Sequence, residues 1–390
     1  MPIINRIAGY HDEMTAWRRD IHAHPETAFE EHRTAEVVAR KLAEFGISVS
    51  RGLAGTGVVG TLKAGKGTRS IGLRADMDAL HIHEKNGFAH RSQNAGRMHA
   101  CGHDGHTTML LGAAKYLAET RNFDGTVHFI FQPAEENEGG GRVMVEQGLF
   151  TSFPVEAVYG MHNWPGMPVG QFGVMKGPMM AAFDIFEITV TGIGCHAAMP
   201  QRGIDPVVVG AEIVSALQTI ASRTVSPLDA AVVSVTQFHA GDTWNVIPEE
   251  AVLRGTTRTF KAEIQDQVEA RVKQIAEGIA MTHGCTAAVR YERRYPATVN
   301  SATETDIARG ALAEVVGEAN VLRDLAPTMG SEDFAFMLQA KPGCYVWIGN
   351  GPGEGGCTLH NPAYDFNDDI LPIGASYWAR LVERSLAKAG

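Results

Sequence analysis

The segment SIGLRADMD, residues 70–78, decides how this chain is organised. Its first residues fit a buried strand, and its end carries two carboxylates, Asp76 and Asp78. The same succession of a short apolar strand and a polar exit recurs at Val127–Phe131 and Ala157–Tyr159. Segments typical of helices flank these strands, at Glu30–Phe45, Thr107–Glu119 and Gly374–Ala387. Strands that alternate with helices predict an α/β domain whose largely parallel sheet is covered by helices.

The middle of the chain has a different order of elements. Its predicted strands are Ile185–Thr191, Ala231–Phe238, Val252–Phe260 and Ala287–Tyr291. A predicted helix, Pro206–Thr224, follows the first strand, and another, Ala262–His283, follows the third. The order β-α-β-β-α-β is that of a ferredoxin-like unit, which is large enough to be its own domain. We therefore predict an α/β domain of residues 1–183 and 294–390, interrupted by an inserted α+β domain of residues 184–293.

Composition restricts the class of protein. At 390 residues, with 44% hydrophobic and 20% charged residues, the chain has enough core material for two domains. A net charge of -10 disfavours nucleic acid or an anionic membrane as the main partner. We find neither a signal peptide nor an apolar run of bilayer length. The five cysteines are odd in number and scattered, which indicates reduced thiols and favours a cytoplasmic location.

The densest cluster of metal-binding residue types is HACGHDGH, residues 99–106. Its three histidines and one cysteine supply imidazole and thiolate donors suited to Zn, Mn, Co or Ni. The alternative is a polar loop before a helix, with His106 close to the helix N-cap. The clustering favours metal binding for the segment, whereas a structural role is favoured for His99 and His106 taken singly.

Further candidates follow the predicted strands. Glu135 and Glu136 lie after the second strand, where one carboxylate could bind metal and the other transfer protons. Such a pair is usually solvated surface, but the carboxyl edge of an α/β sheet is where ligands gather. His162 and His360, taken singly, would be read as structural. Asp76 and Asp78 could orient ligand imidazoles or simply form Asx-turns at the strand exit.

The inserted domain adds three candidates. His196 lies in the small-residue loop GCHAAMP, and Asn245 begins the segment NVIP. Arg258, at the end of an alternating strand, could hold a carboxylate through two hydrogen bonds. It could equally be a solvated charge, and spacing alone does not decide between the two.

The motifs together resemble the aminoacylase, carboxypeptidase G and hippurate hydrolase family of two-metal peptidases. The similarity is strongest to the branch of hippurate hydrolases and auxin-conjugate hydrolases, and it spans essentially the full chain. It is carried, in order, by WRRDIHAHPE (residues 17–26), RADMDAL, HACGHDGH, QPAEE, HAAMP, NVIP, MGSEDF and LHNPAYDFND (residues 359–368).

The resemblance implies a role for each matching residue. The implied metal ligands are Cys101, His103, Glu136, His162 and His360. Glu135 would be the general base. Asp78, which could orient a ligand imidazole, is added to the catalytic candidates on the strength of its position at the strand exit. His196 would reach the substrate from the inserted domain of a partner subunit, while Asn245 and Arg258 would contact the substrate's carbonyl or carboxylate. Cys101 stands where other branches carry a bridging aspartate, so their metal preference does not transfer to this softer, oxidisable ligand.

The implied activity is hydrolysis of the amide bond of N-acyl amino acids by water activated on two divalent metals (Mn, Zn, Ni or Co). The inserted domain would serve as a lid and dimerisation domain of a homodimer or dimer-based oligomer. An aminopeptidase or dipeptidase is the first alternative, but no acidic group for a substrate ammonium can be located. An inactive, metal-binding regulatory paralogue is the second, and the presence of every expected ligand weighs against it. A zinc base deaminase is disfavoured because its H-x-E and P-C-x-x-C motifs do not occur.

Overall fold

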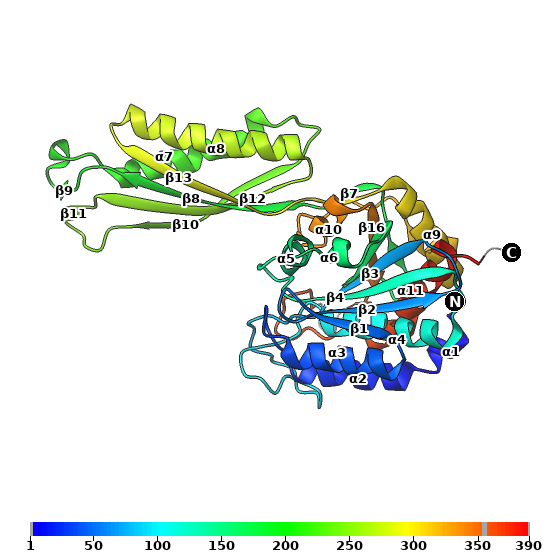
Figure 1. Cartoon of the computed structure of the whole chain (residues 1–390). Coiled ribbons are helices and arrows are strands. Elements are labelled where there is room, and N and C mark those ends of the chain that lie inside the picture. Colours follow the sequence, from blue (N-terminus) through cyan, green and yellow to red (C-terminus); the bar gives the residue numbers. More distant parts are fainter. Residues whose placement is uncertain (1–2, 353–356, 389–390) are drawn as a thin grey trace. The chain divides into compact units, whose positions relative to one another are not determined.

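The computed structural model describes residues 3–352 and 357–388 (Figure 1). The chain divides into two compact units. The first comprises Met1–Met179, Val299–Ala326 and Asp333–Gly390, and the second comprises Met180–Thr298 and Pro327–Glu332. The second unit is therefore an insertion in the first. No helix in the described ranges is long and apolar enough to cross a bilayer.

The first unit is built on an eight-stranded sheet. Its strands, in spatial order, are β1 (Ser48–Leu53), β2 (Gly57–Ala64), β4 (Gly125–Gln132), β3 (Ser70–Asp76), β5 (Ala157–Trp164), β16 (Gly343–Gly349), β6 (Phe172–Gly173) and β15 (Val321–Leu322). The four central strands, β4, β3, β5 and β16, are mutually parallel, whereas β1 and β2 add antiparallel pairs. The predicted α/β class with a largely parallel sheet is confirmed.

Helices of the first unit cover this sheet (Figure 1). They are α1 (Asn5–Ala8), α2 (His11–Ala23), α3 (His32–Glu44), α4 (His103–Thr120), α5 (Gly140–Glu146), α6 (Leu149–Ser152), α9 (Ala302–Val316), α10 (Ala335–Ala340) and α11 (Leu371–Ser385). Most residues of α4 are buried, because α2, α3 and α11 pack against it and β3 lies beneath it. Its apolar residues join those of β3, β4 and β5 in one continuous core. This core fixes the start of α4 against the carboxyl ends of the parallel strands.

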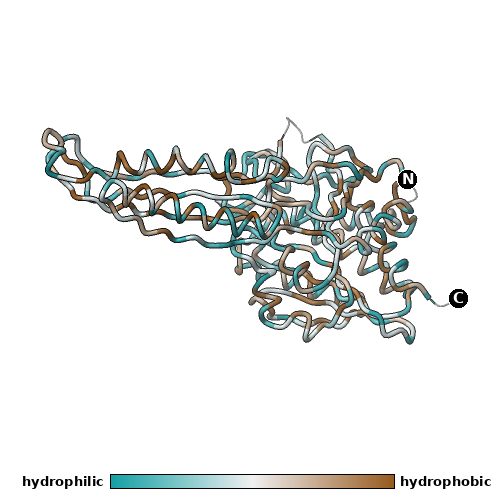
Figure 2. Tube along the Cα trace, turned by 90° about the horizontal axis from the view of Figure 1, so that it is seen from above, coloured by the Kyte–Doolittle hydropathy of each residue, from teal (hydrophilic) through white to brown (hydrophobic). Residues whose placement is uncertain are grey.

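The second unit has one four-stranded antiparallel sheet. Its order is β10 (Ala231–Ala240), β12 (Glu250–Thr259), β8 (Ala182–Thr191) and β13 (Thr286–Tyr295). Helices α7 (Pro206–Thr219) and α8 (Ala262–Thr282) complete the predicted β-α-β-β-α-β order. Every second residue of β8 is buried in a core shared with both helices. Figure 2 shows hydrophobic and hydrophilic residues alternating turn by turn along these helices, as expected for helices with one buried face.

Some predicted boundaries were wrong. The predicted helix Pro206–Thr224 ends as an α-helix at Thr219, and its last residues form a π-helical turn. Helix α4 begins at His103, one turn before the predicted Thr107, so the end of HACGHDGH is helical and not a loop. Strand β5 extends to Trp164, which places His162 inside the strand and not after it. Short strands β7 (Gly177–Met180) and β14 (Thr298–Asn300) pair with each other.

Candidate metal centre and active site

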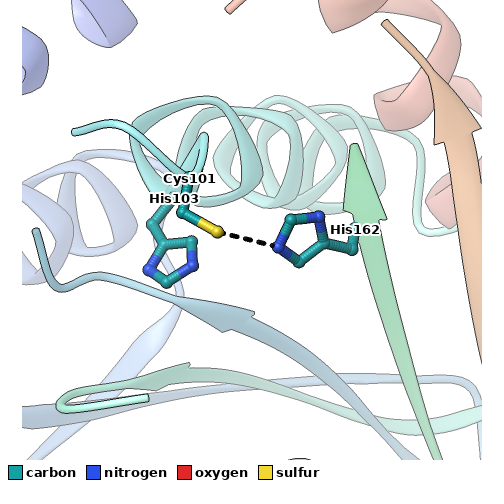
Figure 3. A group of neighbouring side chains, drawn as sticks. All are labelled: Cys101, His103 and His162. Atoms are coloured by element: carbon teal, nitrogen blue, oxygen red, sulfur yellow. Dashed lines mark hydrogen bonds between the residues drawn. The ribbon is translucent and has the colours of Figure 1, made fainter. Parts of the chain in front are cut away.

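The carboxyl ends of β3, β4 and β5 bring together side chains that are far apart in the sequence. Cys101 and His103 precede and begin α4, and His162 comes from β5 (Figure 3). The break between Cys101 and the helix is possible because Gly102 has a φ of 97°, which lies in the left-handed region that favours glycine. The thiol of Cys101 and the first imidazole of α4 therefore face the same space.

Cys101 and His162 are in direct contact. Cys101 Sγ lies 3.3 Å from His162 Nε2 (Figure 3). His162 Nδ1 is 2.6 Å from the backbone oxygen of Asn163, so this nitrogen carries the proton and donates it. The lone pair of Nε2 therefore points toward the thiol, as a ligating imidazole requires.

His103 presents an unused nitrogen in the same space. Its Nδ1 lies 2.9 Å from the backbone oxygen of Asp78 and 3.2 Å from Asp78 Oδ1. Its Nε2 is buried without a hydrogen-bond partner among the described residues. This nitrogen lies 3.8 Å from Asp76 Oδ2, which is an ion-pair distance and too long for a hydrogen bond. A buried imidazole with one nitrogen anchored to a carboxylate and the other without a hydrogen bond is the usual arrangement of a metal ligand. Because His103 Nε2 is buried and makes no hydrogen bond to the described residues, this group of side chains fits a bound cation.

The remaining donors adjoin these three. Ligand atoms of Cys101, Glu136 and His360 lie within 4.8 Å of one another, and so do those of His103, Glu135 and Glu136. His360 Nε2 is 3.1 Å from Glu136 Oε1. The backbone N–H of His360 donates to Ala100 at 2.7 Å, which fixes the positive φ of 63° at this histidine. All five predicted ligands and Glu135 thus lie in one cluster.

The electrostatics of the cluster favour a cation. Burial, followed by the charges of Glu136 and Glu135, raises the pKa of the Cys101 thiol well above its usual range. Burial lowers the pKa of His103, but Asp76 and Asp78 outweigh it and raise this pKa to about 10. Protons therefore occupy donor atoms that a divalent cation would take over, since only deprotonated thiols and imidazoles bind metal.

The two remaining histidines of HACGHDGH differ from the predicted ligands in their contacts, although ligand atoms of His106, Asp76 and His103 also lie within 4.8 Å of one another. His106 Nδ1 donates to Asp76 Oδ1 at 2.7 Å, and His106 Nε2 accepts the backbone N–H of Asn163 at 3.0 Å. Both ring nitrogens of His106 are occupied by hydrogen bonds, which favours a structural role for this residue. His99 is buried without hydrogen bonds to the described residues, and burial lowers its pKa to about 4.

Asn163 is a functional neighbour that the sequence reasoning missed. Its side-chain amide donates to the backbone oxygen of Cys101 at 2.6 Å, and its Oδ1 accepts the Tyr364 hydroxyl at 2.6 Å. Its backbone also contacts His106 and His162. Asn163 therefore ties together the Cys101 loop, helix α4 and strand β5. A polar side chain close to the end of an otherwise buried strand was the signal that could have indicated it.

A second missed group is the buried network around Asp333. Arg74 in β3 donates to Asp76 at 2.6 Å and to Asp333 at 2.9 Å. Asp333 also accepts hydrogen bonds from the side chain of Gln132 and from the backbone of Gly141. The backbone N–H of Asp333 points at Glu135 Oε1 at 3.4 Å. Asp333 lies in the motif MGSEDF, to which the sequence reasoning gave no role.

In the second unit, His196 and Asn245 lie on one small ladder. Strand β9 (Cys195–His196) pairs with β11 (Val246–Ile247), at one end of the unit (Figure 1). The backbone N–H of Ala197 donates to the backbone oxygen of Asn245 at 2.9 Å. His196 Nδ1 accepts the backbone N–H of Ala198 at 3.0 Å. The neutral ring of His196 therefore carries its proton on Nε2, and its side chain is exposed.

Arg258 is not close to these two residues. It pairs in register with Phe183 at one end of β8, whereas the loop to His196 leaves the other end at Thr191. Eight residues along a strand span about 26 Å. The Arg258 guanidinium stacks 4.3 Å above the Phe183 ring and donates to the backbone oxygen of Met329 at 3.1 Å. No ion pair joins Arg258 to a carboxylate among the residues that the structure describes.

The fold and the cluster define a class: α/β proteins that gather thiolate, imidazole and carboxylate donors at the carboxyl ends of parallel strands. Within that class the chain belongs to the peptidase family M20/M25/M40, which it matches over residues 72–384. It is 41% identical to a hippurate hydrolase of Campylobacter jejuni over 386 residues, 99% of this chain and 100% of the relative. It is 40% identical to an N-acetylcysteine deacetylase of Bacillus subtilis over 375 residues, 95% of this chain and 96% of the relative.

The fold of the chain also resembles that of a solved structure. The chain matches the YXEP protein of Bacillus subtilis, a dinuclear metal-binding peptidase of the M20 family, with a TM-score of 0.85 and 36% identity. The match covers 98% of this chain and 100% of that chain. The family resemblance recognised from the motifs is confirmed.

Proposed function

We propose that this chain is a metal-dependent amidohydrolase that cleaves the amide bond of N-acyl amino acids. The observation that carries the proposal is the cluster of Cys101, His103 and His162, in which the buried Nε2 of His103 has no hydrogen-bond partner among the described residues. The relatives named above hydrolyse hippurate or deacetylate N-acetylcysteine, and both substrates are small N-acyl amino acids.

Two divalent metals are proposed to bind at this cluster. Cys101 belongs to two donor groups, one with His103 and His162 and one with Glu136 and His360. Donors shared between neighbouring groups fit a site that would hold two ions close together, and Cys101 would be one of the residues that hold them. The mixture of thiolate, imidazole and carboxylate donors suits Zn, Mn, Co or Ni. Metals held there would supply a water that ionises near neutral pH and would polarise the scissile carbonyl.

Glu135 is proposed as the general base. Its side chain is 7% exposed, adjoins the donors and is held by the Asp333 backbone N–H. It would accept the proton of the attacking water and return it to the departing nitrogen, a role worth about 10²–10⁴-fold in rate. Asp78 is proposed to orient His103 through its carboxylate and to hold Glu136, whose backbone N–H donates to Asp78 Oδ2 at 2.9 Å.

His196 is proposed to stabilise the oxyanion from a second copy of the chain. Its Nε2 proton is free to donate, which is what an oxyanion requires. Arg258, which forms no ion pair with a carboxylate of the described ranges, is the proposed site for the substrate carboxylate, and Asn245 the proposed contact for its carbonyl. A small substrate cannot bridge the roughly 26 Å between Arg258 and the ladder of one subunit. This separation supports a homodimer, or dimer-based oligomer, whose inserted domains exchange His196 and Asn245 between sites.

We also propose a cytoplasmic location. All five cysteines are free of disulfides. Cys101 can serve as a ligand only as a thiolate, and oxidation would remove it from the metal centre. A reducing compartment suits such a site.

The central experiment is Glu135→Gln, assayed with N-acetyl, N-benzoyl and indole-acetyl amino acids and with free-amine dipeptides. We expect kcat to fall by at least about 10²-fold while both metals stay bound, because proton transfer is lost and binding is not. Glu138→Gln is the matched control, since Glu138 is an exposed carboxylate on the same turn and should leave kcat unchanged. Near wild-type turnover of Glu135→Gln would remove Glu135 from the base role. Preference for free-amine dipeptides would favour an aminopeptidase.

The exchange of His196 between subunits has its own test. His196→Ala should lose about 10²–10³-fold in kcat with its metals intact. Mixing inactive His196→Ala with inactive Glu135→Gln should restore partial activity, because each mixed dimer contains one site with both groups. Proven subunit exchange without recovered activity would exclude the cross-subunit arrangement.

A further inference from the structure

The buried carboxylate of Glu31 touches the turn that carries Glu135. Glu31 is the residue before helix α3, and its side chain is fully buried. Its Oε1 accepts the backbone N–H of Ala134 at 2.9 Å and that of Phe29 at 3.0 Å. Its Oε2 accepts the Thr56 hydroxyl at 2.7 Å. A carboxylate from the N-terminal segment therefore holds the residue directly before the proposed base.

Ala134 needs such a partner because its backbone is strained. Its φ of 55° is left-handed, a conformation that costs an alanine free energy relative to glycine. Both of its backbone polar groups are fixed, since its oxygen also accepts the N–H of Gly140 at 2.8 Å. Strain at a non-glycine residue persists only where its surroundings impose it, and it gathers at functional sites. The direction in which the chain leaves Ala134 decides where the Glu135 carboxylate lies.

Glu31 is costly to bury. No lysine, arginine or histidine of the described chain forms an ion pair with it, and burial together with the charge of Asp78 raises its pKa to about 7. A buried carboxylate without a cation destabilises a fold unless its hydrogen bonds compensate. Its three donors come from three separate segments, and the one from Ala134 lies beside the proposed active site.

We propose that Glu31 is a positioning residue that holds the Ala134 turn and thereby aims the Glu135 carboxylate. The inference rests on the proposed role of Glu135. It assigns Glu31 no contact with substrate or metal. Glu136 is held separately, because its backbone N–H donates to Asp78. Disturbing Glu31 should therefore move the base more than the metal ligand.

Two substitutions separate the effect of the length of the Glu31 side chain on kcat from the effect of its charge. Glu31→Gln keeps the length and can still accept both backbone N–H groups, so kcat should stay close to that of the wild type. Glu31→Asp keeps the charge but is one methylene shorter and cannot span Ala134 and Thr56 together. We expect kcat of Glu31→Asp to fall by about 10–10²-fold with KM little changed and both metals bound, since displacements near 1 Å have such effects. Thr56→Val is the matched control: it removes the Oε2 contact and should lower the melting temperature without lowering kcat.

The outcomes are distinguishable from failure of the proposed function. A crystal structure of Glu31→Asp should show that Ala134 or the Glu135 carboxylate has moved. An unchanged turn, wild-type kcat in Glu31→Asp, or an equal loss of kcat in Thr56→Val would overturn the inference while leaving Glu135→Gln inactive. Loss of metal from Glu31→Asp would overturn it too, because Glu136 would then be what Glu31 holds. A displaced turn together with a fully active Glu135→Gln would instead refute the base role and leave the positioning intact.

Discussion

Replacing Gly102 with alanine should disrupt the metal centre without touching a ligand. Gly102 lies between Cys101 and His103 with a φ of 97°. An added Cβ would lie 2.2 Å from Asn163 Nδ2 and 2.8 Å from the Tyr364 hydroxyl, both of which would have to move. Asn163 Nδ2 is the group that donates to the backbone oxygen of Cys101. The substitution therefore separates the Cys101 loop from its support on β5.

The size of the effect follows from these contacts. The left-handed backbone alone costs an alanine about 1–2 kcal/mol. Displacing Asn163 breaks its hydrogen bonds to Cys101 and Tyr364, and each buried group left unsatisfied costs about 1–3 kcal/mol. We expect the first unit of Gly102→Ala to lose about 3–8 kcal/mol of unfolding free energy, a large part of the stability of an ordinary domain. Metal affinity should fall as well, because the Cys101 sulfur shifts.

The assay is urea unfolding with and without added metal, together with metal analysis after dialysis. Gly166→Ala is the matched control: Gly166 also belongs to the first unit, has a φ of 92°, and nothing lies within 4 Å of an added Cβ. Gly166→Ala should lose only the free energy that the left-handed backbone costs an alanine, about 1–2 kcal/mol. Equal stability of the two variants, together with two metals bound to Gly102→Ala at wild-type affinity, would refute the predicted clash with Asn163.

Three further predictions concern buried polar groups. Cys101→Ala should weaken metal binding by more than about tenfold and make activity depend on added metal, as titration against a chelator would show; unaltered stoichiometry and affinity would make Cys101 a structural thiol. Arg74→Met should cost about 3–5 kcal/mol in urea unfolding because it removes the buried guanidinium that balances the charges of Asp76 and Asp333, and a loss below about 1 kcal/mol would contradict the network. Burial lowers the pKa of His22, but Asp104 and Glu84 outweigh it and raise this pKa from 6.5 to about 9. Because the pKa is raised in the folded state, the contribution of His22 to stability is complete below pH 6.5 and disappears by about pH 9. The difference in unfolding free energy between wild type and His22→Gln should therefore shrink over that interval. A difference that stayed constant would argue against the ion pair.

The sequence was sufficient where a pattern is local. Apolar runs that end in polar residues predicted β3 and β4, and the position of Glu135 and Glu136 just after β4 followed from them. The start of α4 was missed because His103, Asp104 and Gly105 are poor helix formers, and tertiary packing overrides their preferences. Gly105 is packed so closely that an added Cβ would lie 2.2 Å from the Phe366 ring.

The residues that support the cluster through hydrogen bonds could not be predicted from sequence spacing, because their contacts join distant segments. Tyr364 bonds Asn163 across 201 residues, and Arg74 bonds Asp333 across 259. Neither pair leaves a local pattern in the sequence. The separation of Arg258 from His196 was hidden for a similar reason. Both belong to the inserted unit, and only the strand register shows that Arg258 of β12 lies beside one end of β8, whereas the loop to His196 leaves the other end.

The position of β16 has a consequence for synthesis on the ribosome. This strand pairs with β5 through seven residues in the middle of the first sheet, yet it follows the whole inserted unit in the chain. Translation proceeds at about 5–20 residues per second, so β5 remains an open, apolar edge of the sheet for roughly ten seconds before β16 is synthesised. An edge of that kind is a template for pairing with other chains until its own neighbour arrives. The nascent chain should therefore need chaperone protection during this interval, and its first unit can finish folding only after the C-terminal segment has left the exit tunnel.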